Sequence, residues 1–283
     1  MRMIGRGQSR WAALACSAVL VTLAAAGCTG TSATPQIIYI TPSPGPVTPL
    51  PSGVTPAPTP APPTPTPAPP TPIIGSAVIS SNAPDNRWTV TFKKPIVSGI
   101  PAASATRMND AITAQVDSYV GAFTGSGLPT LASGAGPSTL EGDFSIALAS
   151  PTLISLRFTL LTYVTGAAHP VGTPGSINFV VSSGATINFT DIFVNPTAAL
   201  TTLSTQARAS LSAQLGSDLT WPGPANSISF FDKAWAMTPA GLEFSWPQGD
   251  LASMAAGMPT ATLRWSAIKS LIKPAGPAGE FVR

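Results

Sequence analysis

Cysteine, histidine and charged residues are scarce in this chain of 283 residues, and each scarcity excludes a class of site. The two cysteines are Cys16 and Cys28, so the chain after residue 28 has no thiol for a disulfide or a zinc site. A zinc site built on the one histidine, His169, would need clustered carboxylates that the sequence does not show. We therefore expect a domain that is stabilised by its hydrophobic core alone and carries no metal or other cofactor.

An excess of positive charge is also missing from most of the chain. The sequence has 14 Lys and Arg against 11 Asp and Glu, and removing Arg2, Arg6 and Arg10 leaves 11 basic against 11 acidic residues. The alkaline isoelectric point is therefore a property of the first residues. A balanced domain of this kind favours neither nucleic acid nor an anionic membrane surface as a partner.

Two catalytic signatures are absent as well. No serine lies in a Gly-x-Ser-x-Gly motif, which would indicate a nucleophile elbow. The glycine-rich stretches at residues 125–127 and 133–136 lack the lysine of a phosphate-binding loop. A weak esterase that pairs His169 with one of the many serines stays open, because catalytic triads are recognised by geometry rather than by order.

The N-terminus has the pattern of a lipoprotein signal peptide at residues 1–27. Three arginines precede an uncharged run from Trp11 to Ala26, which is shorter than the roughly 20 apolar residues that a membrane span needs. The run ends in Ala25-Ala26-Gly27-Cys28, which resembles a lipobox with Ala25 in place of the usual leucine. We expect Cys28 to carry palmitate and other lipid that anchors the chain to the outer face of the plasma membrane. The alternative is ordinary cleavage near Ala26, with Cys28 left as a free thiol.

Residues 28–72 form a proline- and threonine-rich spacer that we expect to be disordered. Thr-Pro and Ala-Pro repeats lack backbone donors and favour polyproline II. At about 3.1 Å per residue, such a segment holds a domain on the order of 100 Å from the membrane.

The remaining residues, 73–283, predict one α+β domain. Alternating or continuous apolar runs predict strands, and apolar residues at helical spacing predict helices. The expected strands cover residues 88–92, 140–148, 153–164, 176–181, 185–189, 233–237, 242–246 and 260–265, and the expected helices cover 104–120, 196–215 and 266–272. The fold we expect is an antiparallel β-sheet packed with two main helices and a short C-terminal helix.

Signals at both ends make the second helix the clearest of these predictions. Asn195 suits the N-cap, Pro196 the first helical position, and Gly216 follows the end. For the first helix we expect Asp110 near the start and Gly121 just past the end.

The candidate binding residues lie in and after the strand that precedes His169. Tyr163, Gly166, His169 and Pro170 fall at the end of that strand and in its loop, and Asp191 is the nearest carboxylate that can partner His169. The structural alternatives are a histidine that holds its loop by bonding to backbone, and an aspartate that caps backbone amides.

Tryptophans are the second candidate for a binding surface. Trp221, Trp235, Trp246 and Trp265 can form a surface for stacking sugars or docking a protein, but tryptophans are more often part of a core. We expect at least two of the four to be core residues.

Several of these motifs, taken in order, resemble the RsiV/PdaC-type extracellular domain, which is shared with secreted mycobacterial immunogenic proteins. They are the loop Thr165-Gly166-Ala167-Ala168-His169-Pro170, the step Asp191-Ile192-Phe193, the turn from Thr238 to Phe244, and Ala255-Ala256-Gly257. The Ala-, Thr-, Pro- and Gly-rich composition resembles an exported actinobacterial protein. The resemblance implies a cell-envelope lipoprotein with a non-enzymatic binding domain for a lysozyme-like wall hydrolase or a peptidoglycan-related glycan. The alternatives are the weak esterase and a structural wall lipoprotein without a specific ligand.

Overall fold

A computed structural model describes residues 70–131, 133–222 and 227–283, which belong to one compact unit. The predicted signal peptide (1–27), the lipidation site at Cys28 and all of the predicted spacer but residues 70–72 lie outside the described residues. Within the described part, no helix combines the length and the apolar character needed to cross a membrane.

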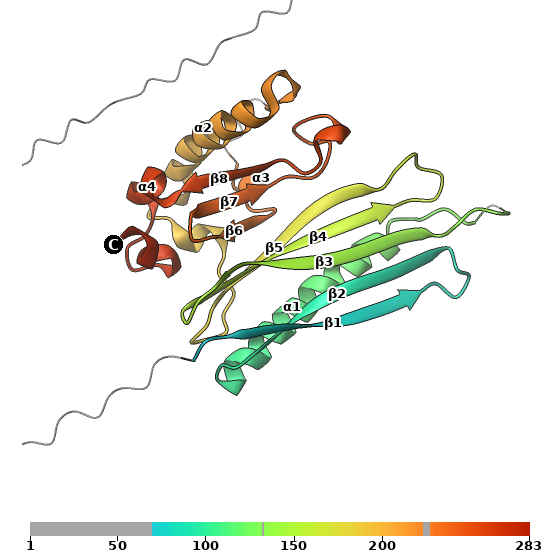
Figure 1. Ribbon diagram of the computed structural model, residues 1–283, viewed down its shortest axis with the longest axis horizontal. Helices are drawn as coiled ribbons and strands as arrows, with labels where there is room; N and C mark the ends of the chain where they lie inside the picture. The colour runs from blue at the N-terminus through green and yellow to red at the C-terminus, as the bar shows by residue number, and fades with distance from the viewer. Residues whose placement is uncertain (1–69, 132, 223–226) are drawn as a thin grey trace, which may run out of the picture. The chain divides into compact units, whose positions relative to one another are not determined.

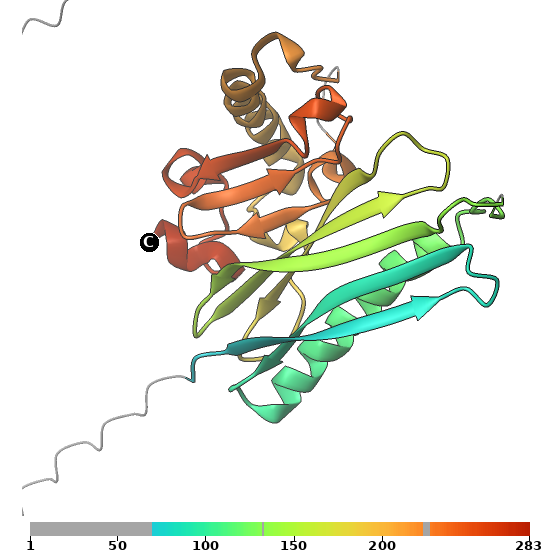
Figure 2. The same ribbon diagram turned by 45° about the vertical axis from the view of Figure 1, so that its right-hand side comes forward.

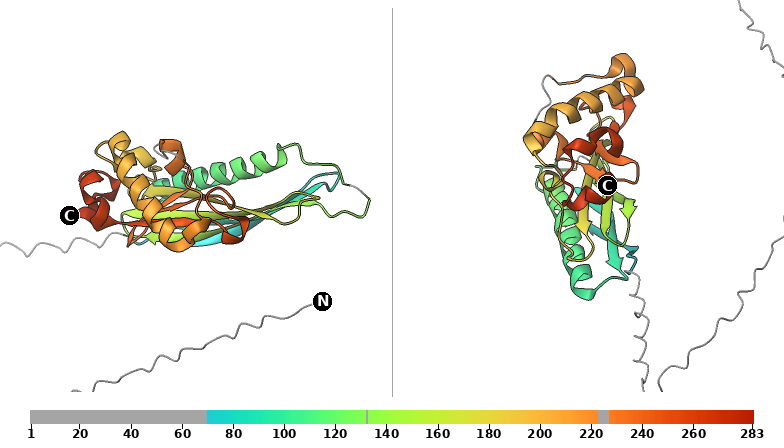
Figure 3. Two further views of the ribbon diagram at one scale, coloured as in Figure 1. Left: turned by 90° about the horizontal axis from the view of Figure 1, so that it is seen from above. Right: turned by 90° about the vertical axis from the view of Figure 1, so that its left-hand side faces the viewer.

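The first half of the domain is a five-stranded sheet with one helix on one face (Figures 1 and 3). The strands lie in chain order, and all neighbours are antiparallel except β2 and β3, which are parallel. Their bounds are β1 (Ile73–Asn82), β2 (Trp88–Ser98), β3 (Ser138–Ala149), β4 (Leu153–Tyr163) and β5 (Val171–Val180). Helix α1 (Ala102–Thr124) connects β2 to β3, because two parallel strands cannot be joined by a tight turn.

Helix α1 forms because its apolar residues recur every three or four positions and meet the sheet on one side. Met108, Ile112 and Val116 are fully buried against the apolar face of the sheet. The helix is longer than the sequence predicts: it continues through Gly121, ends at Thr124 with Gly125 as its C-cap, and places Asp110 well inside rather than near its start. The predicted roles of Asp110 near the start and Gly121 just past the end of this helix are therefore wrong.

Strand β4 shows why the sheet has two different faces. Ile154, Leu156, Phe158 and Leu160 are buried in the cluster that packs against α1. The residues between them are Ser155, Arg157, Thr159 and Leu161, which strand geometry directs to the opposite face. The alternation that predicts this strand from the sequence is confirmed.

The second half of the domain contains a three-stranded antiparallel sheet and the other helices (Figure 2). The sheet consists of β6 (Trp235–Met237), β7 (Gly241–Ser245) and β8 (Thr260–Arg264). The α-helices are α2 (Pro196–Leu215), α3 (Ile228–Phe231) and α4 (Trp265–Ile268), and the 3₁₀ helices are η1 (Phe189–Ile192), η2 (Gly216–Asp218), η3 (Met254–Ala256), η4 (Lys269–Leu271) and η5 (Pro277–Val282). Helix α2 packs against β8 and begins and ends as its capping residues predict.

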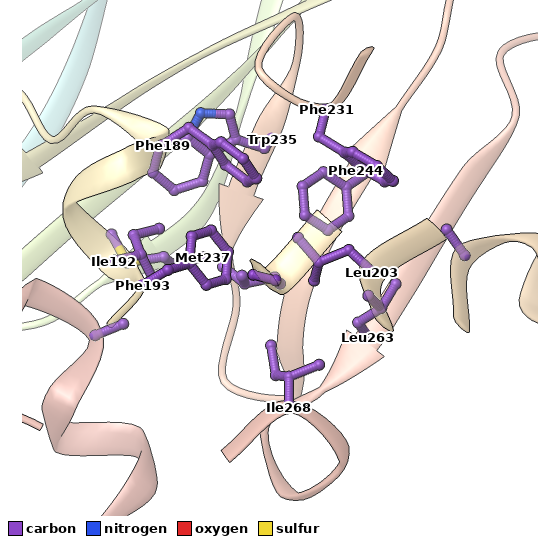
Figure 4. Close-up of a cluster of buried hydrophobic side chains, with 14 of the residues drawn as sticks. Phe189, Ile192, Phe193, Leu203, Phe231, Trp235, Met237, Phe244, Leu263 and Ile268 are labelled. Carbon is purple, nitrogen blue, oxygen red and sulfur yellow. The ribbon is translucent and has the colours of Figure 1, made fainter. Parts of the chain in front are cut away.

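A second hydrophobic cluster stabilises this half. Aromatic rings from η1, α3, β6 and β7 meet in it, as Figure 4 shows for Phe189, Phe231, Trp235 and Phe244. Three of the four tryptophans named in the sequence are buried, with 2–6% of Trp246, Trp235 and Trp265 exposed, which confirms that most of them belong to the core. Trp221 is half-buried and packs against the same cluster.

A group of buried polar side chains, which we call the polar seam, joins the two halves. It lies where β6 crosses β4 and β5 on the face of the sheet opposite α1. The Ser155 hydroxyl accepts a hydrogen bond from the backbone N–H of Met237 (3.0 Å) and donates one to the Asn178 side chain. The Asn178 amide donates to the backbone oxygen of Trp235 (3.1 Å). Because Ser155 and Asn178 are almost fully buried, these bonds fix the position of β6 on the sheet.

The α+β class, the two main helices and the short C-terminal helix are confirmed. The strands, however, form two sheets, and one pair is parallel. The expected hairpin from 176 to 189 is reduced to one isolated bridge between Phe179 and Thr186, followed by η1.

Candidate functional site

Four of the five predicted binding residues lie together at the end of β4. Tyr163 is the last residue of the strand and is half-buried, while Gly166, His169 and Pro170 are exposed in the loop that leads to β5. Gly166 has a φ of 90°, a conformation that glycine adopts readily. The His169 ring places Nδ1 3.0 Å from the backbone oxygen of Pro170. This contact matches the structural alternative, in which the histidine holds its own loop.

The fifth residue, Asp191, does not lie with the other four. It follows the opposite end of β5, and a strand of ten residues spans about 30 Å. Its carboxylate accepts hydrogen bonds from the backbone and side-chain N–H groups of Asn188, both at 3.0 Å, and so caps η1. Asp191 is therefore not placed to polarise His169.

A concave surface lies on the face of the five-stranded sheet that α1 leaves uncovered. Figure 1 shows this face, with α1 behind the strands. A shallow groove of about 450 Å³ runs across β1 to β4 here, and we call it the open-face groove. Its lining consists of Val78, Thr91, Lys93, Glu141, Gly142, Asp143, Thr159 and Leu161. Strand alternation adds Tyr163 to the same face, beyond Leu161.

A smaller cavity of about 160 Å³ adjoins this groove where the two sheets meet, and Thr159 borders both. Hydroxyl groups dominate its polar lining, with Pro174, Met258 and Trp235 as apolar neighbours. The hydroxyl-bearing residues are Ser145, Thr159, Ser176, Ser245 and Thr260. The cavity also contains Arg157 from β4 and Glu243 from β7. We call it the Arg157 cavity.

The Arg157 guanidinium is only partly satisfied in this cavity. Its Nη1 donates to Oε1 of Glu243, which is the more buried partner, with 12% of its side chain exposed against 36% for Arg157. The Nε–H is fully buried and has no partner in the described part of the chain. An unpaired buried donor costs about 1–3 kcal/mol, and an oxygen acceptor would gain this contact once the neighbouring side chains move to expose Nε.

The stereochemistry of the guanidinium defines where such an acceptor binds. Nη1 is occupied by Glu243, which leaves the edge formed by Nε and Nη2 without a protein partner in the described residues. Two N–H groups on one edge of a guanidinium form a planar fork that receives one carbonyl oxygen or both oxygens of a carboxylate. The cavity is therefore a candidate position for a planar oxygen acceptor.

A second hollow of about 410 Å³ lies on the other side of β5 and contains ionisable groups. Burial raises the pKa of Tyr119 to about 12, although hydrogen bonding to Gln115 lowers it in part. Burial also raises the pKa of Asp232 above its ordinary value, and hydrogen bonding to Trp235 opposes this shift. Both shifts favour the neutral form of the group, so they do not create an activated nucleophile.

The sequence offers one signal that could have identified Arg157 and Glu243. Each is the only charged residue in an otherwise apolar or hydroxyl-bearing strand, β4 and β7 respectively. A lone charge in a buried strand needs a partner, and here the partner is the other residue. Among the described residues, no three His, Cys, Asp or Glu side chains lie close enough together to hold a metal ion.

Part of the chain matches a known protein family. Residues 190–266, which contain α2 and all three strands of the smaller sheet, match a family model described as a protein of unknown function, DUF3298. No curated protein matches the sequence. The resemblance to the RsiV/PdaC-type domain stays a prediction.

One solved structure, from Pseudomonas aeruginosa, extends the similarity to most of the domain. A DUF3298 family protein from Pseudomonas aeruginosa PAO1 has a TM-score of 0.52 at 11% identity, covering 71% of this chain and 94% of that chain. A DUF3298 member from Bacteroides fragilis NCTC 9343 has a TM-score of 0.46 at 14% identity, covering 74% and 97% respectively. The Pseudomonas structure supports a shared fold and, at this identity, nothing about activity.

Proposed function

We propose that this chain is a cell-envelope lipoprotein whose α+β domain binds a ligand outside the plasma membrane, without catalysing a reaction. The ligand is a lysozyme-like wall hydrolase or a peptidoglycan-related glycan, and it binds in the open-face groove. The observation that carries the proposal is the unoccupied Nε–Nη2 edge of Arg157 in a hydroxyl-lined cavity beside the groove.

The chemistry of the groove suits a polar, uncharged ligand group. The charges of Lys93 and Asp143 lie 3.7 Å apart, and Arg157 pairs with Glu243, so the lining charges are matched locally except for Glu141, which has no ion-pair partner among the described residues. Matched charges give little long-range attraction for a charged partner. Hydroxyl groups and the guanidinium edge instead offer short-range hydrogen bonds, which suit the amide and hydroxyl groups of a glycan or of a protein loop.

Hydrolysis has no comparable support in the described part of the chain. The His169 ring makes its one hydrogen-bond contact there with the Pro170 backbone and none with a serine. Nucleophilic catalysis requires a base within about 2.6–3.2 Å of the nucleophile. We therefore propose binding rather than hydrolysis as the function.

The experiment is a binding titration of the non-lipidated chain from Thr29 onward, with soluble peptidoglycan fragments in one series and lysozyme in the other. Arg157→Lys keeps the positive charge beside Glu243 but removes the planar fork. We expect it to weaken binding at least tenfold. Arg208→Lys is the matched control, because Arg208 is exposed on α2 and should leave affinity unchanged.

A third variant, His169→Ala, tests the predicted loop. Weaker binding in this variant would extend the site from the groove to residues 163–170, and unchanged binding would confine it to the groove. If neither ligand class binds the unmodified chain, or if Arg157→Lys binds as tightly as Arg208→Lys, the proposed site is wrong.

A further inference from the structure

The two edges of the five-stranded sheet differ in how they are protected. At β5, Pro174 has no N–H to donate, and the backbone of Gly172 exchanges two hydrogen bonds with Gln248, at 2.8 and 2.9 Å. The Ser176 side chain accepts a third bond from the backbone N–H of Trp235 (2.9 Å). This edge is therefore closed to another strand.

The edge at β1 has none of these protections. The strand has ten residues, contains no proline and no charged residue, and pairs with β2 without a bulge from Ile73 to Asn82. Within the described part of the chain, no segment other than β2 pairs with it. Proteins usually block an exposed edge with a lysine, a proline, a bulge or a covering segment, because its free N–H and C=O groups bind another strand.

We propose that β1 pairs with β1 of a second copy of this chain, antiparallel and with Val78 on the two-fold axis. The unpaired backbone groups require an extended strand as the partner, which a second β1 provides. In this register Val78 faces Val78 of the other copy, Ala77 faces Ile79, and Ser76 faces Ser80. At these central positions apolar residues meet apolar residues and hydroxyls meet hydroxyls, while further out Gly75 faces Ser81 and Ile74 faces Asn82.

The exposure of β1 agrees with this pairing. Val78 is 68% exposed, more than any other large hydrophobic side chain in the described residues. Pairing would bring two such side chains within about 4.5–5.5 Å of each other and bury part of each. The five-stranded sheets of the two copies would become one continuous sheet across the two-fold axis.

Electrostatic repulsion does not oppose the pairing. The closest charged neighbours are Lys93 and Lys94, which lie opposite Val78 and Ala77 on β2. The two copies of Lys93 would be separated by three strand spacings, about 14 Å, which exceeds the screening length of about 10 Å at 0.1 M salt. Lys93 also has its own partner in Asp143, and Lys94 donates to Thr113.

The absence of cysteine after residue 28 makes a direct test possible. In the chain from Thr29 onward, Val78→Cys should form a disulfide-linked dimer under mild oxidation, because paired antiparallel residues have Cα atoms within disulfide range. Ser80→Cys is the matched control on the same strand. In the proposed register its two copies lie about 13 Å apart along the strands, so it should not cross-link.

Sedimentation velocity gives the second readout without any cysteine. The unmodified chain should sediment as a dimer at micromolar concentration, and Val78→Lys should weaken self-association at least tenfold by placing two like charges on the axis. Val78→Thr keeps a neutral, β-branched residue and should leave the dimer in place. Circular dichroism checks that each variant is folded.

Three outcomes would overturn the inference. They are a monomer at all concentrations, equal cross-linking of the two cysteine variants, and a dimer that Val78→Lys leaves intact. A monomer would leave β1 open to an extended peptide from another protein. Ligand binding in the open-face groove is measured separately, so its failure and the failure of the dimer are distinguishable.

Discussion

The phenol of Tyr119 occupies the space that a side chain at Gly175 would need. A Cβ at this position would lie 2.0 Å from the Tyr119 hydroxyl oxygen and 2.7 Å from the ring carbon that carries it. The ring itself packs between Phe92 and Phe158, so it has little room to move. Gly175 on β5 and Tyr119 on α1 therefore pack directly against each other.

We predict that Gly175→Ala lowers the free energy of unfolding by about 1–3 kcal/mol through overpacking. Tyr119→Phe removes the nearer of the two clashing atoms, so the same alanine should cost less in that background. A double-mutant cycle by urea denaturation measures the difference. Equal costs in both backgrounds would show that the two residues are not coupled.

The buried phenol also predicts how stability changes at alkaline pH. The pKa of Tyr119 is about 12 in the folded chain and 10.0 when unperturbed, so the folded state favours the protonated form. This contribution is fully present below pH 10 and is lost as the pH rises from 10 to 12, at about 1.4 kcal/mol per pH unit. We expect Tyr119→Phe to lose less stability over this range than the unmodified chain, as measured by urea denaturation at each pH.

The sequence predicts a site at the His169 loop, which stays a prediction, and it did not single out the Arg157 cavity. A histidine in a loop is visible as a rare residue, whereas Arg157 and Glu243 become a pair only when two strands 86 residues apart meet. Asp191 was grouped with His169 because the two are close in sequence. Strand β5 lies between them and separates them in space.

At the scale of elements, the N-cap of α2 offers a direct test of the capping role that the sequence predicts for Asn195. Asn195 Oδ1 accepts a hydrogen bond from the backbone N–H of Ala198 (3.0 Å). We predict that Asn195→Ala lowers the free energy of unfolding by about 1 kcal/mol, whereas Asn195→Asp retains the cap and costs much less. Thermal unfolding of the two variants checks this, and equal losses would contradict it.

The bounds of elements that begin and end with capping residues were predictable from the sequence. The bounds of elements without such residues were less predictable. Helix α2 has its cap, its proline and its glycine, and its bounds match the prediction. Helix α1 lacks a side-chain cap, so its ends were placed too far inside. Strand β1 was not predicted at all, because its apolar residues Ile73, Ile74, Val78 and Ile79 follow neither a helical nor an alternating pattern.

At the scale of the whole molecule, two hydrophobic clusters are joined by the polar seam at Ser155 and Asn178. Asn178→Ala removes the side-chain donor to the Trp235 backbone oxygen and the acceptor of the Ser155 hydroxyl, which keeps its bond from the Met237 N–H. We predict a loss of about 3 kcal/mol and a thermal transition whose calorimetric enthalpy exceeds its van't Hoff enthalpy, because each half retains its own core. The exposed Asn82→Ala should keep a single transition, and a single transition in both variants would show that the apolar clusters alone couple the halves.

The fold class followed from the sequence, but the arrangement of the strands did not. Periodicity identifies which residues are buried in each strand, but it does not specify which strands are neighbours. The parallel pairing of β2 with β3 depends on α1 returning the chain to the same end of the sheet. The crossing of β6 over β4 and β5 depends on contacts between residues about 60 to 80 positions apart.

The parallel pairing of β2 with β3 has a consequence for the order of folding. It joins residues 50 positions apart, such as Val90 and Leu140, whereas β1 with β2 and β3 with β4 are hairpins of near neighbours. Closing a loop of this length costs entropy before any contact compensates for it. The two local units should therefore form early, and the rate of refolding should depend on the docking of α1 that brings them together.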